Sequence, residues 1–276
     1  MKIVNEKIKE WFIVNTSSTT DTVLLKVNGR VATVEMNRPE ALNALNKEMI
    51  KSLVIKLKEI SDSDEIDVVV LTGKGRAFSS GGDIKSMLTL NSESDFFSIM
   101  DSISELIVTL YSMPKLTISA ISGAAAGLGL SVALATDFIL AHADSKLAMN
   151  FIGIGLIPDG GAHFFLEKRL GEMKAKKLIW EGKVLGAATA QEMGLIDEVI
   201  SGELTEGVEA KITEWLQLPV QAMIKTKKIL ADSNRAQLLK ILELEKQGQR
   251  KMRETQDHLE GIQAFVEKRK PNFIGK

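Results

Sequence analysis

The stretch that decides the fold is LTISAISGAAAGLGLSVALATDFILAHADSKLAMNFIGIGLIPDGG, residues 116–161. The stretch begins with an apolar run, residues 116–121, that is typical of a strand. Small residues follow, and a helix is predicted over residues 127–135. A second strand is expected over residues 137–141. A strand, turn and helix in this order can aim backbone N–H groups at a ligand, because the first amides of a helix lack internal partners and lie at the positive end of its dipole. The acidic residue Asp159 follows close by.

The region before this stretch begins with a predicted hairpin. Polar and apolar residues alternate over residues 22–37, and Asn28-Gly29 interrupts them, which is a strong signal for two antiparallel strands. Asn46 can accept a hydrogen bond from the first turn of a helix, so we expect a helix from there to about residue 60. The first 20 residues read as an extension without an assigned function.

A buried strand is predicted over residues 66–73, which are short, apolar and β-branched. The loop after it, KGRAFSSGGDI at residues 74–84, carries paired glycines that allow a ligand to approach the backbone closely. Ser92 with Asp95 resembles a capping box that opens a helix to residue 111. Repeated strand–helix alternation predicts right-handed crossovers and a mainly parallel sheet, hence an α/β fold.

The remainder of the chain has helical periodicity almost throughout. We expect helices near residues 162–169, 172–181, 187–193, 206–216, 220–231, 236–254 and 257–269.

Composition narrows the functional classes. The 276 residues carry a net charge of −1, which gives no general attraction to nucleic acid or to an anionic membrane. The absence of cysteine excludes disulfides, thiolate metal sites and cysteine nucleophiles, and is compatible with a reducing compartment, so we expect a cytoplasmic protein. No apolar run approaches the roughly 20 residues that span a bilayer, and the N-terminus makes a poor signal peptide.

Several common chemistries lack their motifs. There is no phosphate-binding P-loop sequence and no G-x-S-x-G nucleophile elbow. His142, His163 and His258 are scattered without a partner at a ligand spacing, so no metal site is expected.

Five motifs together carry a family resemblance. They are VATVEMNRPEALNALN, VVVLTGKGRAFSSGGDI, ISGAAAGLGLSVALATDFILA, GLIPDGG and FVEKRKPNF. In this order and spacing they resemble the crotonase superfamily, the enoyl-CoA hydratase/isomerase family, over about residues 22–274. The resemblance implies a crotonase-like ββα spiral core over residues 22–200 with the acyl-CoA site, and a C-terminal helical region over residues 201–276 that makes trimer contacts. Residues 1–21 would precede this fold.

The resemblance also implies a pair of backbone donors. Family members stabilise a thioester enolate with two N–H groups, and the matching positions here are Ser80 and Leu128. The chemistry requires such donors because removing a proton beside a thioester places negative charge on the carbonyl oxygen.

The side-chain acids depart from the family's hydratases, which use two glutamates. Along the matched motifs those positions hold Ser131 and Phe151, and neither side chain can act as a general base. Asp159 matches the acidic position of the family's Δ3,Δ2-enoyl-CoA isomerases, and isomerisation needs only one base. The alternative is that Asp159 only caps the helix starting at Ala162. Burial would raise the pKa of Asp159 and the helix N-terminus would lower it, and the sequence leaves the outcome open.

The remaining site predictions concern the ligand and alternate acids. The resemblance places Arg38, Ala77, Phe78, Gly81, Gly82, Asp83, Ile84 and Phe151 along the CoA and acyl channel, and Phe265 and Lys268 near the nucleotide of a neighbouring subunit. Met87, Leu88, Phe97 and Met100 read either as acyl-pocket wall or as plain core. Glu93, Asp95 and Asp101 are alternate acids, whereas Asp83 and Asp137 read as structural.

We therefore expect an acyl-CoA enzyme that shifts a double bond, with CoA as part of the substrate and no other cofactor. The alternatives are a hydratase or another lyase or hydrolase of the same fold, and a catalytically silent acyl-CoA-binding protein. The expected partners are the thioester and further copies of the chain, as a homotrimer or a dimer of trimers, without nucleic acid or membrane.

Overall fold

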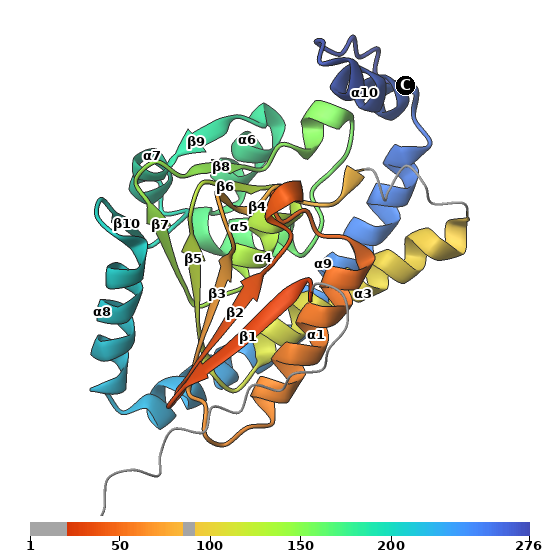
Figure 1. Cartoon of the computed structure of the whole chain (residues 1–276). Coiled ribbons are helices and arrows are strands. Elements are labelled where there is room, and N and C mark those ends of the chain that lie inside the picture. Colours follow the sequence, from red (N-terminus) through yellow and green to blue (C-terminus); the bar gives the residue numbers. More distant parts are fainter. Residues whose placement is uncertain (1–20, 85–91) are drawn as a thin grey trace, which may run out of the picture.

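The computed structural model describes residues 21–84 and 92–276 (Figure 1). The predicted N-terminal extension, except Asp21, and the predicted pocket residues Met87 and Leu88 lie outside the described residues.

The larger of two sheets has six strands. Its first pair is the predicted hairpin, in which β1 (Val23–Asn28) runs antiparallel to β2 (Val31–Met36). All other pairings in this sheet are parallel. The order is β1-β2-β3-β5-β7-β10, where the later strands are β3 (Val68–Gly73), β5 (Leu116–Ile121), β7 (Phe138–His142) and β10 (Glu198–Ile200). The predicted mainly parallel α/β sheet is confirmed.

The second sheet has four strands in the order β4-β6-β8-β9: β4 (Ala77–Ser79), β6 (Ala124–Ala126), β8 (Lys146–Ala148) and β9 (Val184–Gly186). Its first three strands each follow directly on a strand of the larger sheet, and a helix follows each pair. The repeats are β3-β4-α3, β5-β6-α4 and β7-β8-α5, with α3 (Glu93–Ser112), α4 (Leu128–Leu134) and α5 (Ala162–Leu170). This is the expected ββα spiral.

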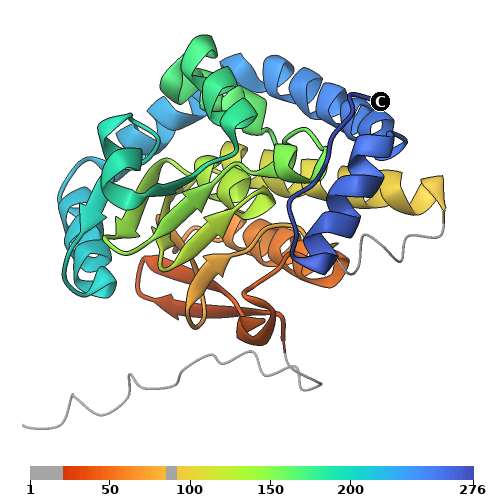
Figure 2. The same cartoon turned by 90° about the horizontal axis from the view of Figure 1, so that it is seen from above.

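Both faces of the larger sheet are buried at its central strands β3, β5 and β7. Side chains alternate along β3, so that Val69 and Leu71 pack with α1 (Lys47–Ser61) and α3, while Val68 and Val70 pack on the opposite face. That second face is covered by α8 (Leu204–Leu216) and the start of α9 (Val220–Arg253), as Figures 1 and 2 show. Burial on both faces accounts for the continuous apolar runs in the sequence of the parallel strands.

Two helix starts form as predicted. The Asn46 side chain accepts a hydrogen bond from the Met49 N–H at 2.9 Å, and Ser92 Oγ accepts one from the Asp95 N–H at 3.1 Å. Both caps satisfy donors that a helix leaves without partners.

The C-terminal region is helical as expected, with α10 (Gln256–Glu267) after α8 and α9; α6 (Glu172–Glu181) and α7 (Ala187–Glu192) precede it. The prediction of two helices over residues 220–231 and 236–254 is wrong, because α9 is one helix of 34 residues. Ser233 and Asn234 at the expected break both donate to the Leu230 carbonyl, so their polar groups are satisfied inside the helix. Two short 3-10 helices, η1 (Pro39–Ala41) and η2 (Phe151–Ile154), and the short strands β9 and β10 were not anticipated.

Across residues 21–84 and 92–276, no helix combines the length and apolar character needed to cross a membrane.

Candidate active site

Two glycine loops meet at the predicted site. Gly81, after β4, has φ +102°, and Gly127, before α4, has φ +51°, a backbone region that favours glycine. A Cβ atom on Gly81 would lie 2.8 Å from the Ala126 carbonyl oxygen, and one on Gly127 would lie 3.9 Å from the Gly81 Cα. The absence of side chains therefore lets the two loops lie backbone to backbone.

The amide predicted as the first donor is already engaged. The Ser80 N–H donates to the Leu42 carbonyl oxygen at 2.9 Å, so the prediction for Ser80 is not supported. The backbone on either side of Gly82 pairs with Leu45: the Leu45 N–H donates to the Gly81 carbonyl oxygen, and the Leu45 carbonyl oxygen accepts from the Asp83 N–H. Because successive peptide groups in an extended chain point to opposite sides, the Gly82 N–H points away from Leu45. It makes no hydrogen bond to any residue that the structure describes.

The second predicted donor is free. Leu128 is the first residue of α4, and its N–H has no acceptor among the described residues. A Cβ on Gly81 would lie 3.5 Å from this nitrogen, so the Gly81-Gly82 backbone and the Leu128 amide are neighbours. The amides of Gly82 and Leu128 are thus two donors, free of any described acceptor, where the loops meet.

Asp159 lies beside the start of α4. The Ser131 hydroxyl of α4 donates to the Asp159 carbonyl oxygen at 2.8 Å. Gly160 and Gly161 follow with φ of +66° and +74°, and a Cβ on Gly160 would lie 2.7 Å from Leu128 Cδ1. The glycine pair therefore lets the segment that carries Asp159 pack directly against Leu128 and Ser131.

Asp159 does not cap α5, so that alternative is wrong. Gly161 occupies the cap position without a side-chain hydrogen bond. Instead, the Glu245 carboxylate of α9 accepts the Gly161 N–H at 2.7 Å and the His163 N–H at 3.1 Å. Its Oε1 also contacts His163 Nδ1 at 2.7 Å. A glutamate from a distant helix thus supplies both the acceptor and the negative charge that favour a helix start.

The Asp159 carboxyl is 5% exposed. Its Oδ2 accepts a hydrogen bond from Gln249 Nε2 of α9 at 3.3 Å, whereas its Oδ1 has no hydrogen-bond partner in the described structure. Burial, aided by the negative charge of Glu245, raises the pKa of Asp159 to about 8. The question left open by the sequence is thereby answered, because burial outweighs the influences that lower this pKa.

The two positions that hold glutamate in the family's hydratases carry other chemistry here. Ser131 is fully buried, and its hydroxyl is committed to the Asp159 backbone. The Phe151 ring lies 3.6 Å from where a Cβ on Gly127 would be, so it contributes an apolar wall beside the glycine loops.

The alternate acids on α3 have other partners. Glu93 pairs with Arg250 at 2.6 Å, Asp101 pairs with Lys246 at 3.0 Å, and the Asp95 carboxylate accepts from Ser92 Oγ at 2.8 Å. All three are at least partly exposed, unlike the buried Asp159. Asp137 accepts hydrogen bonds from the Thr117 N–H and from Lys227 Nζ, each at 2.8 Å, in the structural role predicted for it.

The predicted CoA residues differ in burial and in partners. Arg38 Nη1 donates to the Ala44 carbonyl at 2.6 Å and to Asp83 Oδ2 at 3.1 Å, so this pair holds two loops together. The side chains of Ala77 and Phe78 lie in the core, and the prediction that they line the channel is not supported for their side chains. Gly82, Asp83, Ile84 and Phe151 are half-buried, and Phe265 and Lys268 are exposed, so their roles stay predictions. Met100 is core and Phe97 is half-buried against it.

The three histidines have separate partners. His163 contacts Glu245, His258 Nδ1 lies 2.8 Å from the Ile154 carbonyl oxygen, and His142 lies 3.8 Å from Asp144. Among residues 21–84 and 92–276, no cluster of three or more potential metal-binding side chains is present.

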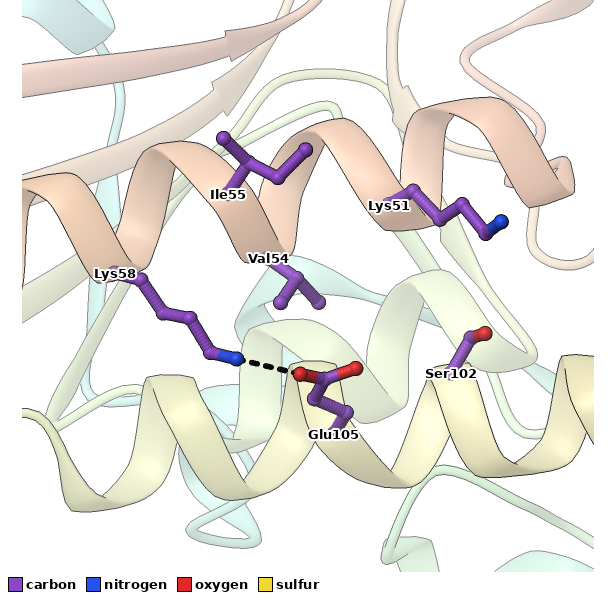
Figure 3. A pocket seen from close by; sticks show the side chains of 6 residues that line it. All are labelled: Lys51, Val54, Ile55, Lys58, Ser102 and Glu105. Atoms are coloured by element: carbon purple, nitrogen blue, oxygen red, sulfur yellow. Dashed lines mark hydrogen bonds and ion pairs between the residues drawn. The ribbon is translucent and has the colours of Figure 1, made fainter.

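A surface groove between α1 and α3 lies apart from this site. Its walls include an ion pair of Lys58 and Glu105 at 2.6 Å, and Val54 points into the gap between the helices (Figure 3). None of the lining side chains, Lys51, Val54, Ile55, Lys58, Ser102 and Glu105, belongs to the predicted catalytic or CoA-binding set.

Comparison with known proteins decides the family. The sequence profile described as enoyl-CoA hydratase/isomerase matches residues 26–276. The chain belongs to this family, the crotonase superfamily. The protein YhaR of Bacillus subtilis (strain 168), which is named after this family, is 49% identical over 246 residues, covering 89% of this chain and 96% of that protein.

Two further members carry more specific names. The 1,2-epoxyphenylacetyl-CoA isomerase of Escherichia coli (strain K12) is 33% identical, over 92% of this chain and 98% of its own length. The crystal structure of an enoyl-CoA hydratase from Mycobacterium avium subsp. paratuberculosis K-10 superimposes with a TM-score of 0.83 at 30% identity, over 93% of this chain and 100% of that chain. The crotonase-like fold is confirmed, and the chain is an acyl-CoA enzyme of this family.

Sequence reasoning missed the contribution of α9 to the site. Leu238, Leu242, Glu245 and Gln249 are all buried, and they recur at helical spacing. The sequence signal for this contribution is that Glu245 and Gln249 continue the apolar stripe of the helix. A buried carboxylate or amide needs specific hydrogen-bond partners, so such positions indicate a tertiary contact.

Proposed function

We propose that this family member is an enoyl-CoA isomerase that moves a double bond from C3 to C2 of the acyl group, with Asp159 as its single acid–base group. The observation that carries the proposal is the Asp159 carboxyl: it is buried, the segment that carries it packs against Leu128 and Ser131, and one of its oxygens has no partner among the described residues. Ser131 and Phe151, at the positions of the hydratase glutamates, offer no second base.

The proposed reaction begins when the Asp159 carboxylate removes a proton from C2 of a 3-enoyl thioester. The C–H electron pair delocalises into the thioester, and the negative charge forms on the carbonyl oxygen. The amides of Gly82 and Leu128 donate hydrogen bonds to that oxygen, a stabilisation worth on the order of 10²–10³ in rate per donor. Asp159 then returns the proton to C4, the double bond forms between C2 and C3, and the carbonyl is restored.

The surroundings of Asp159 support this proton transfer. No water is consumed, and the reaction needs no cofactor beyond the CoA of the substrate. The apolar Phe151 and Leu128 side chains limit the access of water, which protects the enolate from side reactions. A pKa of about 8 also brings this base close to neutral pH, where general-base catalysis is efficient.

The test compares the wild-type chain with Asp159→Asn on 3-enoyl-CoA and 2-enoyl-CoA. The wild type should convert 3-enoyl-CoA to 2-enoyl-CoA without forming 3-hydroxyacyl-CoA, and Asp159→Asn should lose about 10²–10⁴ in kcat. Asp101→Asn, which alters an exposed carboxylate of α3, is the matched control and should keep the wild-type rate.

The other two functions predict different results. A hydratase would form 3-hydroxyacyl-CoA from 2-enoyl-CoA, and hydration that survives Asp159→Asn overturns the proposal. An acyl-CoA-binding protein without catalysis would bind CoA thioesters and turn over neither substrate.

A further inference from the structure

Whereas Gln247 is exposed, Gln249, near the C-terminal end of α9, is only 1% exposed. It lies 90 residues from Asp159 in sequence. A Cβ on the preceding residue, Gly248, would meet the side-chain end of Ile157. The glycine thus leaves room for α9 to lie directly against the segment that carries Asp159.

The orientation of the Gln249 amide follows from its partners. Nε2 donates to the Ile157 carbonyl oxygen at 2.5 Å and to Asp159 Oδ2 at 3.3 Å. A backbone carbonyl only accepts hydrogen bonds, so the nitrogen and not the oxygen of the amide must face Ile157. Both N–H groups of one side chain are therefore used within the same three-residue segment.

This arrangement makes the two oxygens of Asp159 different. A proton on Oδ2 would oppose the N–H of Gln249, whereas Oδ1 has no hydrogen-bond partner in the described structure. We infer that Gln249 is the positioning residue of Asp159: it holds Oδ2 and the Ile157 carbonyl, and so confines proton exchange with the substrate to Oδ1. This inference rests on the proposed isomerase function.

Packing alone does not account for a glutamine at this position. Gln249 Oε1 is buried and has no hydrogen-bond partner among the described residues, which costs free energy that an apolar side chain of similar size would avoid. A glutamate would add a further carboxylate next to Glu245 and Asp159, where like charges disfavour ionisation. Glutamine supplies a neutral donor to the carboxylate.

Among the described residues, α9 and α5 carry the charged groups around Asp159. From α9, Glu245 lies one turn before Gln249 and its charge acts on Asp159, while Arg253 lies one turn after, with its guanidinium 5.0 Å from the centre of the Phe96 ring. From α5, His163 is bound to Glu245, and α4 contributes the uncharged Ser131 hydroxyl.

The test uses Gln249→Met, which keeps the length of the side chain and removes the donor, with Gln247→Met on the exposed face of the same helix as the matched control. Gln249→Met should lower kcat about 10- to 100-fold with little change in KM, since a hydrogen bond to a charged group is lost. The apparent pKa of the rising limb of kcat/KM against pH should increase by about one unit, because the carboxylate loses the donor on Oδ2. Gln247→Met should match the wild type in both.

The double variant Asp159→Asn with Gln249→Met should be no slower than Asp159→Asn, because Gln249 acts through that carboxyl. A wild-type pH profile in Gln249→Met, or a full additional loss in the double variant, overturns the positioning role. If either of these results is found while Asp159→Asn still loses activity, the isomerase proposal stands and only the positioning role of Gln249 fails. Full activity of Asp159→Asn overturns both.

A measurement that does not depend on catalysis separates a change in the Asp159 pKa from a loss of activity caused by misfolding. The pH dependence of the free energy of unfolding, wild type against Asp159→Asn, reports the Asp159 pKa in the folded protein. Repeating the comparison in the Gln249→Met background should extend the pH-dependent range to higher pH, and an unchanged range would contradict the role given to Gln249.

Discussion

At the scale of single residues, the chemistry depends on how one carboxyl is surrounded. Asp159 has one oxygen held by Gln249, one oxygen without a partner among the described residues, and a backbone carbonyl held by Ser131. Burial disfavours the charged form, and the nearby Glu245 adds to this effect. The surroundings that raise the pKa of Asp159 therefore also destabilise the folded protein when this carboxyl ionises.

That cost has a defined dependence on pH. Asp159 has a pKa of about 8 in the folded protein and 3.8 as its ordinary value. Between these values the folded state binds a proton that the unfolded state has released, so stability falls as pH rises. The protonated Asp159 contributes its full stabilisation below pH 3.8, and this contribution is lost as the pH rises through about 8. Wild type should lose up to about 1.4 kcal/mol per pH unit relative to Asp159→Asn. Urea unfolding at several pH values from 5 to 8 measures this, and parallel curves would contradict it.

The choice of Gly82 over Ser80 as a donor is also a residue-scale claim. Gly82→Pro removes the N–H and should lower kcat on the order of 10²–10³-fold. Gly82→Ala adds a side chain but keeps the N–H, so it serves as the control for steric change. Initial rates with 3-enoyl-CoA provide the measurement. If Gly82→Pro is as fast as Gly82→Ala, the amide of Gly82 plays no part.

At the scale of elements, α9 connects the C-terminal region to the site. Its buried stripe supplies Glu245 to the start of α5 and Gln249 to Asp159. Each contact joins residues at least 82 apart in the chain. The catalytic segment is thus fixed from two sides, by α4 through Ser131 and by α9 through Glu245 and Gln249.

Glu245→Gln removes the negative charge of Glu245 and keeps the size of its side chain, so it tests the charge apart from the packing of α9 against α5. An amide has one acceptor oxygen, so it cannot accept the hydrogen bonds from both Gly161 and His163 as the carboxylate does, and a loss of about 1–3 kcal/mol of stability is expected. Removal of the negative charge should also lower the apparent pKa of Asp159, opposite to the effect of Gln249→Met. Thermal unfolding and a pH profile of kcat/KM measure the two effects. The exposed Glu243→Gln on the same helix is the control, and an unchanged Asp159 pKa in Glu245→Gln would refute the electrostatic role.

At the scale of the whole molecule, α6 and α10 expose large apolar side chains. On α10 these are Leu259, Phe265 and Val266, and on α6 they are Met173 and Trp180. Exposed large apolar side chains concentrated on single helices are typical of an interface. We propose that further copies of the chain cover these side chains, as a trimer or a dimer of trimers.

Light scattering tests that assembly. The mass in solution should be three or six times the 30.2 kDa of one chain, and Leu259→Glu with Val266→Glu should lower it. A charged pair placed in the interface would lose its solvation without gaining partners. A monomeric wild type would contradict the assembly.

The sequence was sufficient for those parts of the fold that depend on local signals. The Asn28-Gly29 turn, the Asn46 and Ser92 caps and the apolar strands each carry their own evidence, and the structure contains them. The break expected within α9 was wrong because Asp232, Ser233 and Asn234 have weak helix propensity, which the packing of α9 against α3 overrides. Three-residue strands such as β9 show too few residues for a period.

The site was only partly predictable for a related reason. Asp159 and Leu128 could be found from their motifs, but the choice between Ser80 and Gly82 depends on which way each N–H points. That direction is set by pairing with Leu42 and Leu45, which local sequence does not reveal. Glu245 and Gln249 act across the tertiary structure, and only their place on a buried stripe indicates them.

The central claim is that one buried carboxyl carries one proton from C2 to C4. A single turnover of 3-enoyl-CoA deuterated at C2, run in ordinary water with the product analysed by mass spectrometry and NMR, tests it most directly. Because Asp159 is 5% exposed, the account predicts 2-enoyl-CoA with deuterium at C4. Product in which C4 carries only solvent hydrogen, or a 3-hydroxyacyl-CoA product, would contradict it.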